Sequence, residues 1–274
     1  MPHLRDIPLA YLEIVMVGTR FPENVGMAVR ACANMGCGGV ILAAPERWDV
    51  EKARPLATAK GMQRLEAVRV VDSLSAAVRD KVRVYGTTAR TGGWRQSVLT
   101  PEQAAEELAP LLLEDCPTAL VFGPEDRGLN NAEIESCQRL VTIPTSGDAS
   151  SLNVAQAVLL LAYECRKAVL RVTSAPSGVP AGDPAEGSRR ITQAERDLLY
   201  ARLRETLLAI DFLRPDNPEY FLMPVRRFLG KSTIRRHEMD MLMGICRQVN
   251  RLVQKKGDGR VAEKKQMFAI YGTR

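Results

Sequence analysis

The stretch LEIVMVGTRFPENVGMAVRACANMGCGGVILAAP, residues 12–45, decides the fold. It begins with an apolar run at 12–18 that is typical of a buried strand, and apolar side chains then recur at helical spacing over 24–35. A second apolar run follows at 40–43 and ends before a proline. A strand, a helix and a strand in this order predict the βαβ unit from which parallel sheets are built.

The same alternation continues to about residue 171. Further strands are expected at 68–71, 82–87, 118–122 and 140–143, and helices at 74–79, 101–113, 131–137 and 153–170. Thr100 and Pro101 mark one helix start, because a hydroxyl caps free N–H groups and proline fits the first helical position. The fold class predicted for residues 1–171 is α/β, with a mostly parallel sheet and helices on both faces.

The expected helix at 153–170 is apolar on most of its faces. It reads NVAQAVLLLAYECRKAVL, with no charge before Glu164. A helix of this kind must be buried. Burial against a second subunit and burial in the core both explain the pattern, and the dimer contact is the preferred interpretation.

Residues 172–190 are rich in Pro, Gly, Ser and Ala, which predicts a linker. The net charge of the chain is +6, and it is unevenly divided. Residues 1–188 carry a balance of −3 and residues 189–274 a balance of +9. A basic module beside a near-neutral one favours binding to a polyanion, although a solvated basic surface has the same charge.

Residues 191–274 form the expected basic helical extension. Helices are predicted at 192–212, 220–229 and 235–255, and residues 257–274 are expected to be frayed. A basic cluster surrounds a glycine turn and suits phosphate contacts: Arg226, Arg227, Lys231, Arg235 and Arg236. The alternative is that these long side chains cover apolar surface.

Three unusual loops follow strands of the predicted sheet, at 87–93, 122–129 and 143–153. In open α/β sheets, ligands bind at the carboxyl ends of the strands. Each of these loops contains glycine, which allows close approach of a ligand to the backbone. The helix at 24–35 adds Asn24, Gly26 and Arg30. Gly26 and Arg30 share a face, so Gly26 is expected to leave room for Arg30 to reach an anion; alone, they are a helix cap and a surface arginine.

Several classes of protein are excluded. The sequence has no P-loop and no nucleophile elbow, and with two His and no closely spaced Cys pair we expect no metal. No apolar run reaches the roughly 18–20 residues that span a bilayer, so no membrane partner is expected. The six Cys and the lack of an apolar leader are typical of a cytoplasmic protein.

Three segments together resemble a known family: ENVGMAVRACANMG at 23–36, VFGPEDRGL at 121–129 and IPTSGDASSLNVAQAV at 143–158. In this order they are similar to the three motifs of the SPOUT-superfamily RNA 2′-O-ribose methyltransferases, in particular the TrmH-like group. Past the linker, residues 213–249 resemble the helical extension of the TrmJ-like tRNA methyltransferases.

The resemblance implies a trefoil-knotted methyltransferase domain that binds S-adenosylmethionine and works as a homodimer with a composite active site. It implies tRNA as substrate, with cytidine or uridine at nucleotide 32 of the anticodon loop as the target. The implied cofactor-binding residues are Thr87, Thr88, Gly123, Glu125, Gly128, Ile143, Pro144, Ser151, Leu152 and Asn153.

In the same family, Arg30 would be the catalytic arginine, with Asn24, Ser151 and Asn153 arranging the RNA, and Arg90 is a further candidate. Because arginine is rarely deprotonated, we expect Arg30 to hold a phosphate and steady the developing oxyanion. The sequence does not identify the residue that acts as general base. Many relatives carry an aromatic residue where this chain has Ala149, so the nucleotide that the enzyme prefers stays undetermined.

Other functions remain compatible with these residues. The chain could methylate ribosomal RNA or another tRNA position, or bind RNA without catalysis on the same scaffold. The intact Arg30, Asn153 and the three loops favour an enzyme.

Overall fold

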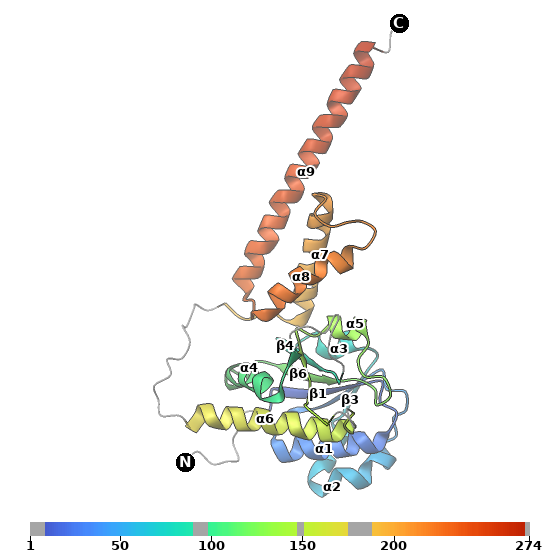
Figure 1. The fold of residues 1–274 in the computed structure, drawn as a ribbon, viewed down its shortest axis with the longest axis vertical. Coiled ribbons are helices and arrows are strands. Elements are labelled where there is room, and N and C mark those ends of the chain that lie inside the picture. The colour runs from blue at the N-terminus through green and yellow to red at the C-terminus, as the bar shows by residue number, and fades with distance from the viewer. Residues whose placement is uncertain (1–8, 90–97, 147–150, 175–187, 272–274) are drawn as a thin grey trace. The chain divides into compact units, whose positions relative to one another are not determined.

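The computed structural model describes residues 9–89, 98–146, 151–174 and 188–271 (Figure 1). The chain divides into two compact units, Met1–Pro184 and Ala185–Arg274. Arg90 and Ala149 lie outside the described residues, as does most of the expected linker.

The first unit is built on a seven-stranded sheet in the order β3-β2-β1-β6-β4-β7-β5, and all of its strand pairs are parallel. The mostly parallel sheet predicted from the sequence is therefore confirmed. The two-residue strand β5 was not expected, because so short a segment has no periodicity to detect. The strands are β1 Leu12–Val17, β2 Gly39–Ala43, β3 Arg69–Val71, β4 Arg83–Thr87, β5 Val98–Leu99, β6 Thr118–Phe122 and β7 Arg139–Val141.

Helices cover both faces of this sheet. The larger layer holds α1 Pro22–Met35, α2 Val50–Glu66, α4 Pro101–Leu113 and α6 Val154–Ser174, and the smaller layer holds α3 Leu74–Val78 and α5 Asn131–Glu135. Successive side chains of β1 point to opposite faces of the sheet, so this strand contributes to both hydrophobic cores. Ile14 and Met16 pack with the larger layer, while Val15 and Val17 pack with the smaller one.

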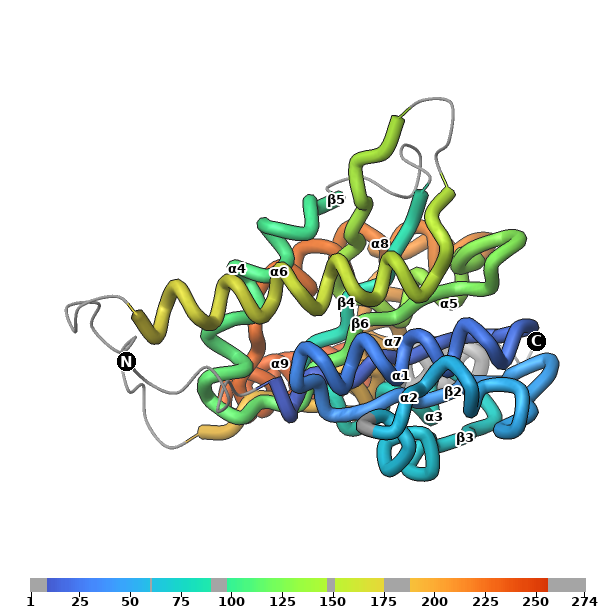
Figure 2. Tube along the Cα trace, turned by 90° about the horizontal axis from the view of Figure 1, so that it is seen from below, coloured from blue at the N-terminus to red at the C-terminus, as the bar shows by residue number. Residues whose placement is uncertain are grey.

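Helix α2 was not foreseen from the sequence. It contains Pro55 and Gly61, and its backbone is non-helical at Thr58, where φ is 62°. A proline and a break of this kind weaken the helical pattern. The helix lies beside α1 in Figure 2.

The expectation that Gly26 leaves space for a ligand was wrong. A Cβ on Gly26 would lie 2.2 Å from the backbone oxygen of Ala53 in α2. Gly26 therefore lets two helices approach closely, and the space beside it is filled by protein.

Helix α6 is amphipathic rather than buried all round. One face packs in the core with α1 and α4, through residues such as Val158, Leu161 and Cys165. Leu159, Leu160 and Tyr163 are 40–50% exposed on the other face. Core burial therefore accounts for only part of the apolar pattern.

The second unit consists of α7 Gln193–Ala209, α8 Pro218–Lys231 and α9 Arg236–Tyr271, as the sequence predicts for the extension. The side chains of Thr192 and Glu195 form the expected capping box at the start of α7. Residues past 257 are not frayed, because α9 continues to Tyr271. Leu199, Ile234 and Met239 lie in its small core.

Candidate functional site

Four neighbouring strands bring the expected loops together. Strands β1, β6, β4 and β7 are adjacent and parallel, so their carboxyl ends lie at one edge of the sheet. The register aligns Met16 with Phe122, and Thr87 with Val141. The loops that follow these strands therefore meet at the same edge, although they are far apart in the sequence.

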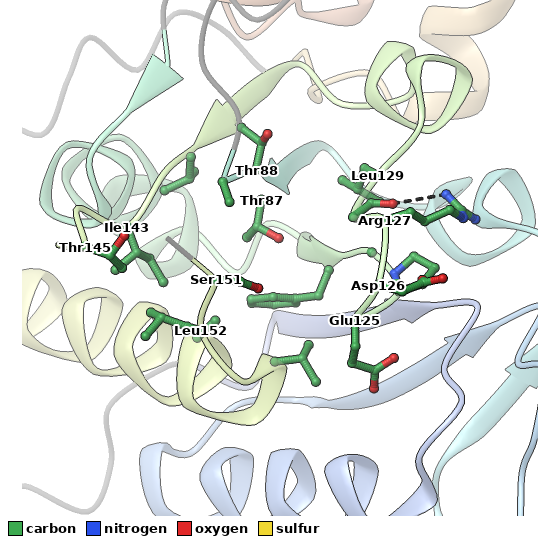
Figure 3. A pocket seen from close by; sticks show the side chains of 18 residues that line it. Thr87, Thr88, Glu125, Asp126, Arg127, Leu129, Ile143, Thr145, Ser151 and Leu152 are labelled. Atoms are coloured by element: carbon green, nitrogen blue, oxygen red, sulfur yellow. Dashed lines mark hydrogen bonds between the residues drawn. The ribbon is translucent and has the colours of Figure 1, made fainter. Parts of the chain in front are cut away.

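A cavity of about 290 Å³ lies among these loops (Figure 3). Its apolar side chains include Leu129, Ile143 and Leu152, and it also exposes hydroxyl groups and loop backbone. Eight of the ten predicted cofactor-binding residues line it, namely Thr87, Thr88, Gly123, Glu125, Gly128, Ile143, Ser151 and Leu152. Pro144 is not among its lining residues, and Asn153 lines a neighbouring cavity instead. Thr145 and Ala157 also line the cavity; they lie within the 143–158 motif but are not among the predicted cofactor-binding residues.

Two glycines shape the loop that follows β6, for different reasons. A Cβ on Gly123 would lie 2.3 Å from the carbonyl carbon of Gly128, so the loop folds back on itself only with glycine there. Gly128 has φ +67°, a left-handed conformation that favours glycine, and the space around it is open. Both glycines are therefore required by the loop itself.

A chain of hydrogen bonds joins the three sequence motifs. The Asn24 Nδ2 donates to Glu125 Oε1 at 2.8 Å, and Asn153 Nδ2 donates to Asn24 Oδ1 at 2.9 Å. Asn153 Oδ1 in turn accepts from the backbone N–H of Ala155 at the start of α6. Asn24, at the centre of the chain, is only 7% exposed, whereas Glu125 is half-buried and Asn153 is exposed. The structure thus places Asn24 and Asn153 together, as their assignment to one site requires.

The same residues also line a second, more open cavity of about 530 Å³. It is lined by Phe21, Glu23, Asn24, Glu125, Ser151, Leu152 and Asn153. It shares Glu125, Ser151 and Leu152 with the first cavity, so the two are contiguous. Glu125 Oε2 is buried and accepts no hydrogen bond within the described protein. A buried carboxylate oxygen without a partner is costly, which suits a donor on a bound ligand.

An ion-pair network that sequence reasoning missed ties these loops together. Arg20 donates to Glu46 at 2.7 Å and to Asp126 at 2.5 Å. The hydrogen bond from Arg20 lowers the pKa of Glu46. Arg20 thereby links the loops that follow β1, β2 and β6. The three residues are up to 106 positions apart, so no sequence pattern could have paired them.

Arg30 does not contribute to either cavity. It is exposed on α1 and is not among the lining residues of either one. Helix α2 passes beside it, since a Cβ on Gly61 would lie 4.0 Å from the Arg30 Cα. Within a single chain, the structure does not bring Arg30 to the predicted site.

The predicted basic cluster of the second unit is partly neutralised. Arg226 donates to Glu219 at 3.1 Å and lies 5.3 Å from the ring centre of Tyr200. Arg236 forms an ion pair with Glu195 at 2.7 Å.

The remaining members of the cluster differ in exposure. Arg235 donates to the backbone oxygen of Ser188 at 2.9 Å and is half-buried. Arg227 and Lys231 are exposed, as is Phe228 between them. A surface of positive charge with an aromatic ring is therefore present on α8.

Within the described ranges, no three His, Cys, Asp or Glu side chains gather in a way that could hold a metal ion. In the same ranges, no helix is both long and apolar enough to cross a membrane.

Comparisons with known proteins agree with the sequence motifs. Residues 11–163 match the SpoU rRNA methylase family, and residues 194–258 match the C-terminal domain of the tRNA methyltransferase TrmJ. The chain is 35% identical to the tRNA (cytidine/uridine/adenosine-2′-O-)-methyltransferase TrmJ of Pseudomonas aeruginosa, over 89% of this chain and 95% of that protein. It is 32% identical to the tRNA (cytidine/uridine-2′-O-)-methyltransferase TrmJ of Pectobacterium atrosepticum, over 88% and 97%.

Solved structures show the same likeness. The crystal structure of TrmJ from Z. mobilis superposes with a TM-score of 0.69 at 29% identity, over 87% of this chain and 98% of that one. The family resemblance of the three motifs is thus confirmed along most of the chain. The chain belongs to the SpoU family of methyltransferases and, within it, to the TrmJ group.

Proposed function

We propose that this protein transfers a methyl group from S-adenosylmethionine to the ribose 2′-oxygen of tRNA, at cytidine or uridine 32 of the anticodon loop. The observation that carries the proposal is the hydrogen-bonded chain Glu125–Asn24–Asn153. It unites the three family motifs where the two cavities meet. The names of the relatives, which are tRNA 2′-O-methyltransferases, support the same reaction. The proposed tRNA substrate supports a cytoplasmic location for the activity.

The first cavity fits the proposed cofactor. Its volume is close to the lower end of the range of about 300–1,000 Å³ that is common for small-molecule sites. Leu129, Ile143 and Leu152 would flank a flat ring, and the hydroxyls of Thr87 and Ser151 could bond to polar groups. The cofactor would supply a methyl group on a sulfonium, so the reaction requires no metal.

The residues of the second cavity would position the RNA. Asn24 and Asn153 hold each other and Glu125 in fixed orientations, which reduces the reorganisation needed when a ribose binds. Arg30 would hold a phosphate and stabilise the developing oxyanion. Since Arg30 lines neither cavity of its own chain, we propose that it serves the site of a second copy.

The exposed face of α6 supports such a homodimer. Leu159, Leu160 and Tyr163 are large apolar side chains exposed on one helix. A second copy packed there would bury them, and the composite site would then form only in the dimer. The trefoil knot of the family also stays a prediction.

The direct test is methyl transfer from labelled S-adenosylmethionine to unmodified tRNA transcripts. The modified nucleotide would be identified by nuclease digestion and mass spectrometry. A single 2′-O-methyl pyrimidine at nucleotide 32 is the expected product. Transfer to another tRNA position or to ribosomal RNA would contradict the substrate, and binding of the cofactor without any transfer would contradict the activity.

Arg30→Lys tests the role of the arginine. Lysine keeps the charge but loses the two-pronged geometry, so we expect turnover to fall strongly. Near-normal turnover with lysine would contradict a bidentate phosphate contact.

A further inference from the structure

We propose that the second cavity is the subsite for the target base, in which Phe21 stacks on the base and Glu23 accepts a hydrogen bond from its exocyclic amino group. The inference rests on the proposed function and adds two residues to it: Phe21 for affinity and Glu23 for base specificity. It predicts that cytidine is preferred to uridine.

Phe21 occupies an unusual position. It is the N-cap residue of α1, its side chain makes no capping hydrogen bond, and it is 53% exposed. Ser, Thr, Asp and Asn are strongly preferred at such positions because they satisfy free backbone N–H groups. A half-exposed phenyl ring neither caps the helix nor fills the core, so helix stability does not explain it.

The place of Phe21 beside Asn24 in the second cavity accounts for its exposed ring. Phe21 and Asn24 are three residues apart, and both line the second cavity. The lining of this cavity also includes the residues of the hydrogen-bonded chain, with the unpartnered Glu125 Oε2. A ribose held by these residues would lie beside the first cavity, which shares Glu125, Ser151 and Leu152. Its base would then reach Phe21 and Glu23, which line the same cavity.

An aromatic ring is well suited to an unstacked base. Sequence-specific proteins bind single-stranded RNA loops by splaying out bases and stacking them on aromatic side chains. Stacking alone accepts every base, because each has an aromatic face. Phe21 should therefore contribute to affinity for tRNA while distinguishing little between bases.

Glu23 supplies the discrimination. It is exposed, and it lines the same cavity as Phe21. A carboxylate accepts a hydrogen bond from the cytosine amino group, whereas uracil presents a carbonyl oxygen at the same position. A negative charge against that oxygen is unfavourable. An acidic residue in the first turn of a helix also stabilises the helix by its favourable interaction with the helix dipole, so the test must separate this role from base recognition.

The first experiment measures steady-state methylation of full tRNA by the full-length chain and its variants. Phe21→Ala should raise KM for tRNA about tenfold, with kcat and the dissociation constant of S-adenosylmethionine changed less than about twofold. Phe21→Trp should restore KM. Tyr11→Ala is the matched control, because Tyr11 is an exposed aromatic residue at the opposite end of β1.

The second experiment compares transcripts that differ only in having cytidine or uridine at the methylated position. The wild-type chain should prefer cytidine in kcat/KM. Glu23→Gln should shift this ratio at least threefold toward uridine, since an amide can donate to a carbonyl oxygen, while thermal stability changes little.

Three results would overturn the subsite. An unchanged KM in Phe21→Ala, together with an unchanged base ratio in Glu23→Gln, would show that neither side chain contacts the base. Dissociation of a dimer by Phe21→Ala would show that a second copy covers the ring. If the wild-type chain methylates no tRNA, the proposed function fails and the subsite fails with it; an active wild type with unresponsive variants overturns the subsite alone.

Discussion

Asn24 lies between two polar groups of the second cavity and bonds to both. Its amide donates to Glu125 and accepts from Asn153. The residue is almost fully buried, so water cannot replace a lost partner at low cost. One side chain therefore orients a carboxylate and an amide that come from separate loops.

We expect Asn24→Ala to lower the rate of methyl transfer at least tenfold and the free energy of unfolding by about 1–3 kcal/mol, because the half-buried Glu125 carboxylate and the Asn153 amide lose their shared partner. Turnover assays and denaturant titrations would measure the two effects. Asn131→Ala, on the exposed start of α5, is the control and should behave as the wild type. Wild-type turnover in Asn24→Ala would contradict the assigned role.

At the scale of elements, the contact between α1 and α2 depends on a single glycine. Gly26→Ala would gain about 0.5–1 kcal/mol in helix propensity, but its Cβ would meet a backbone oxygen at 2.2 Å. Forced repacking typically costs about 1–3 kcal/mol. The steric effect is the larger one, so we expect net destabilisation by about 1–2 kcal/mol.

Gly61→Ala in α2 is the matched control for that substitution. Its Cβ would lie 3.6 Å from its nearest neighbours, which is ordinary contact distance. We expect no loss of stability, and a gain of up to about 1 kcal/mol. Tryptophan fluorescence during denaturation would follow both variants, because Trp48 and Trp94 belong to the first unit. Equal stability of the two variants would contradict the tight contact.

The start of α7 should respond to pH. The hydrogen bond from Arg189 lowers the pKa of Glu195 to about 2. The pKa of a glutamate in an unfolded chain is about 4.3. The stabilisation is therefore fully present above about pH 5 and is lost as the pH falls toward 2.

Glu195→Gln keeps a side chain that suits the capping box but removes the charge. We expect it to destabilise the second unit at pH 7 by about 1 kcal/mol, a value reduced for solvent screening. The difference from the wild type should vanish near pH 2. Circular dichroism would measure it, with the tryptophan signal of the first unit as internal control. A difference that is independent of pH would show that charge is not the cause.

At the scale of the whole molecule, the two units divide the charge between them. The excess of basic residues follows residue 188, and the cavities belong to the first unit. We expect the second unit to bind the tRNA body through phosphates. The double variant Arg227→Ala/Lys231→Ala should weaken tRNA binding and reduce the slope of log K against log salt by about 1–2.

Cofactor binding should be unaffected by this double variant, because the first cavity contains neither residue. Arg202→Ala removes an exposed arginine that pairs with Glu205 on the same helix, and it serves as the control. Calorimetry and filter binding over a range of salt would measure both ligands. An unchanged salt slope would contradict phosphate contacts at α8.

The sequence by itself determined the parallel sheet, the capped helices and the three motifs of the site. These features depend on neighbours a few residues apart, such as Thr192 and Glu195, so periodicity and spacing reveal them. Helix α2 was not predicted because Pro55 and Gly61 disrupt that local pattern. The tertiary structure alone decided that Gly26 faces Ala53 and that Arg20 joins three loops. It also decided that Asn24 bonds to Glu125 and Asn153, which lie 101 and 129 positions further along the chain. Such pairings arise when the strands assemble in an order that differs from their order in the chain, and no local signal carries that information.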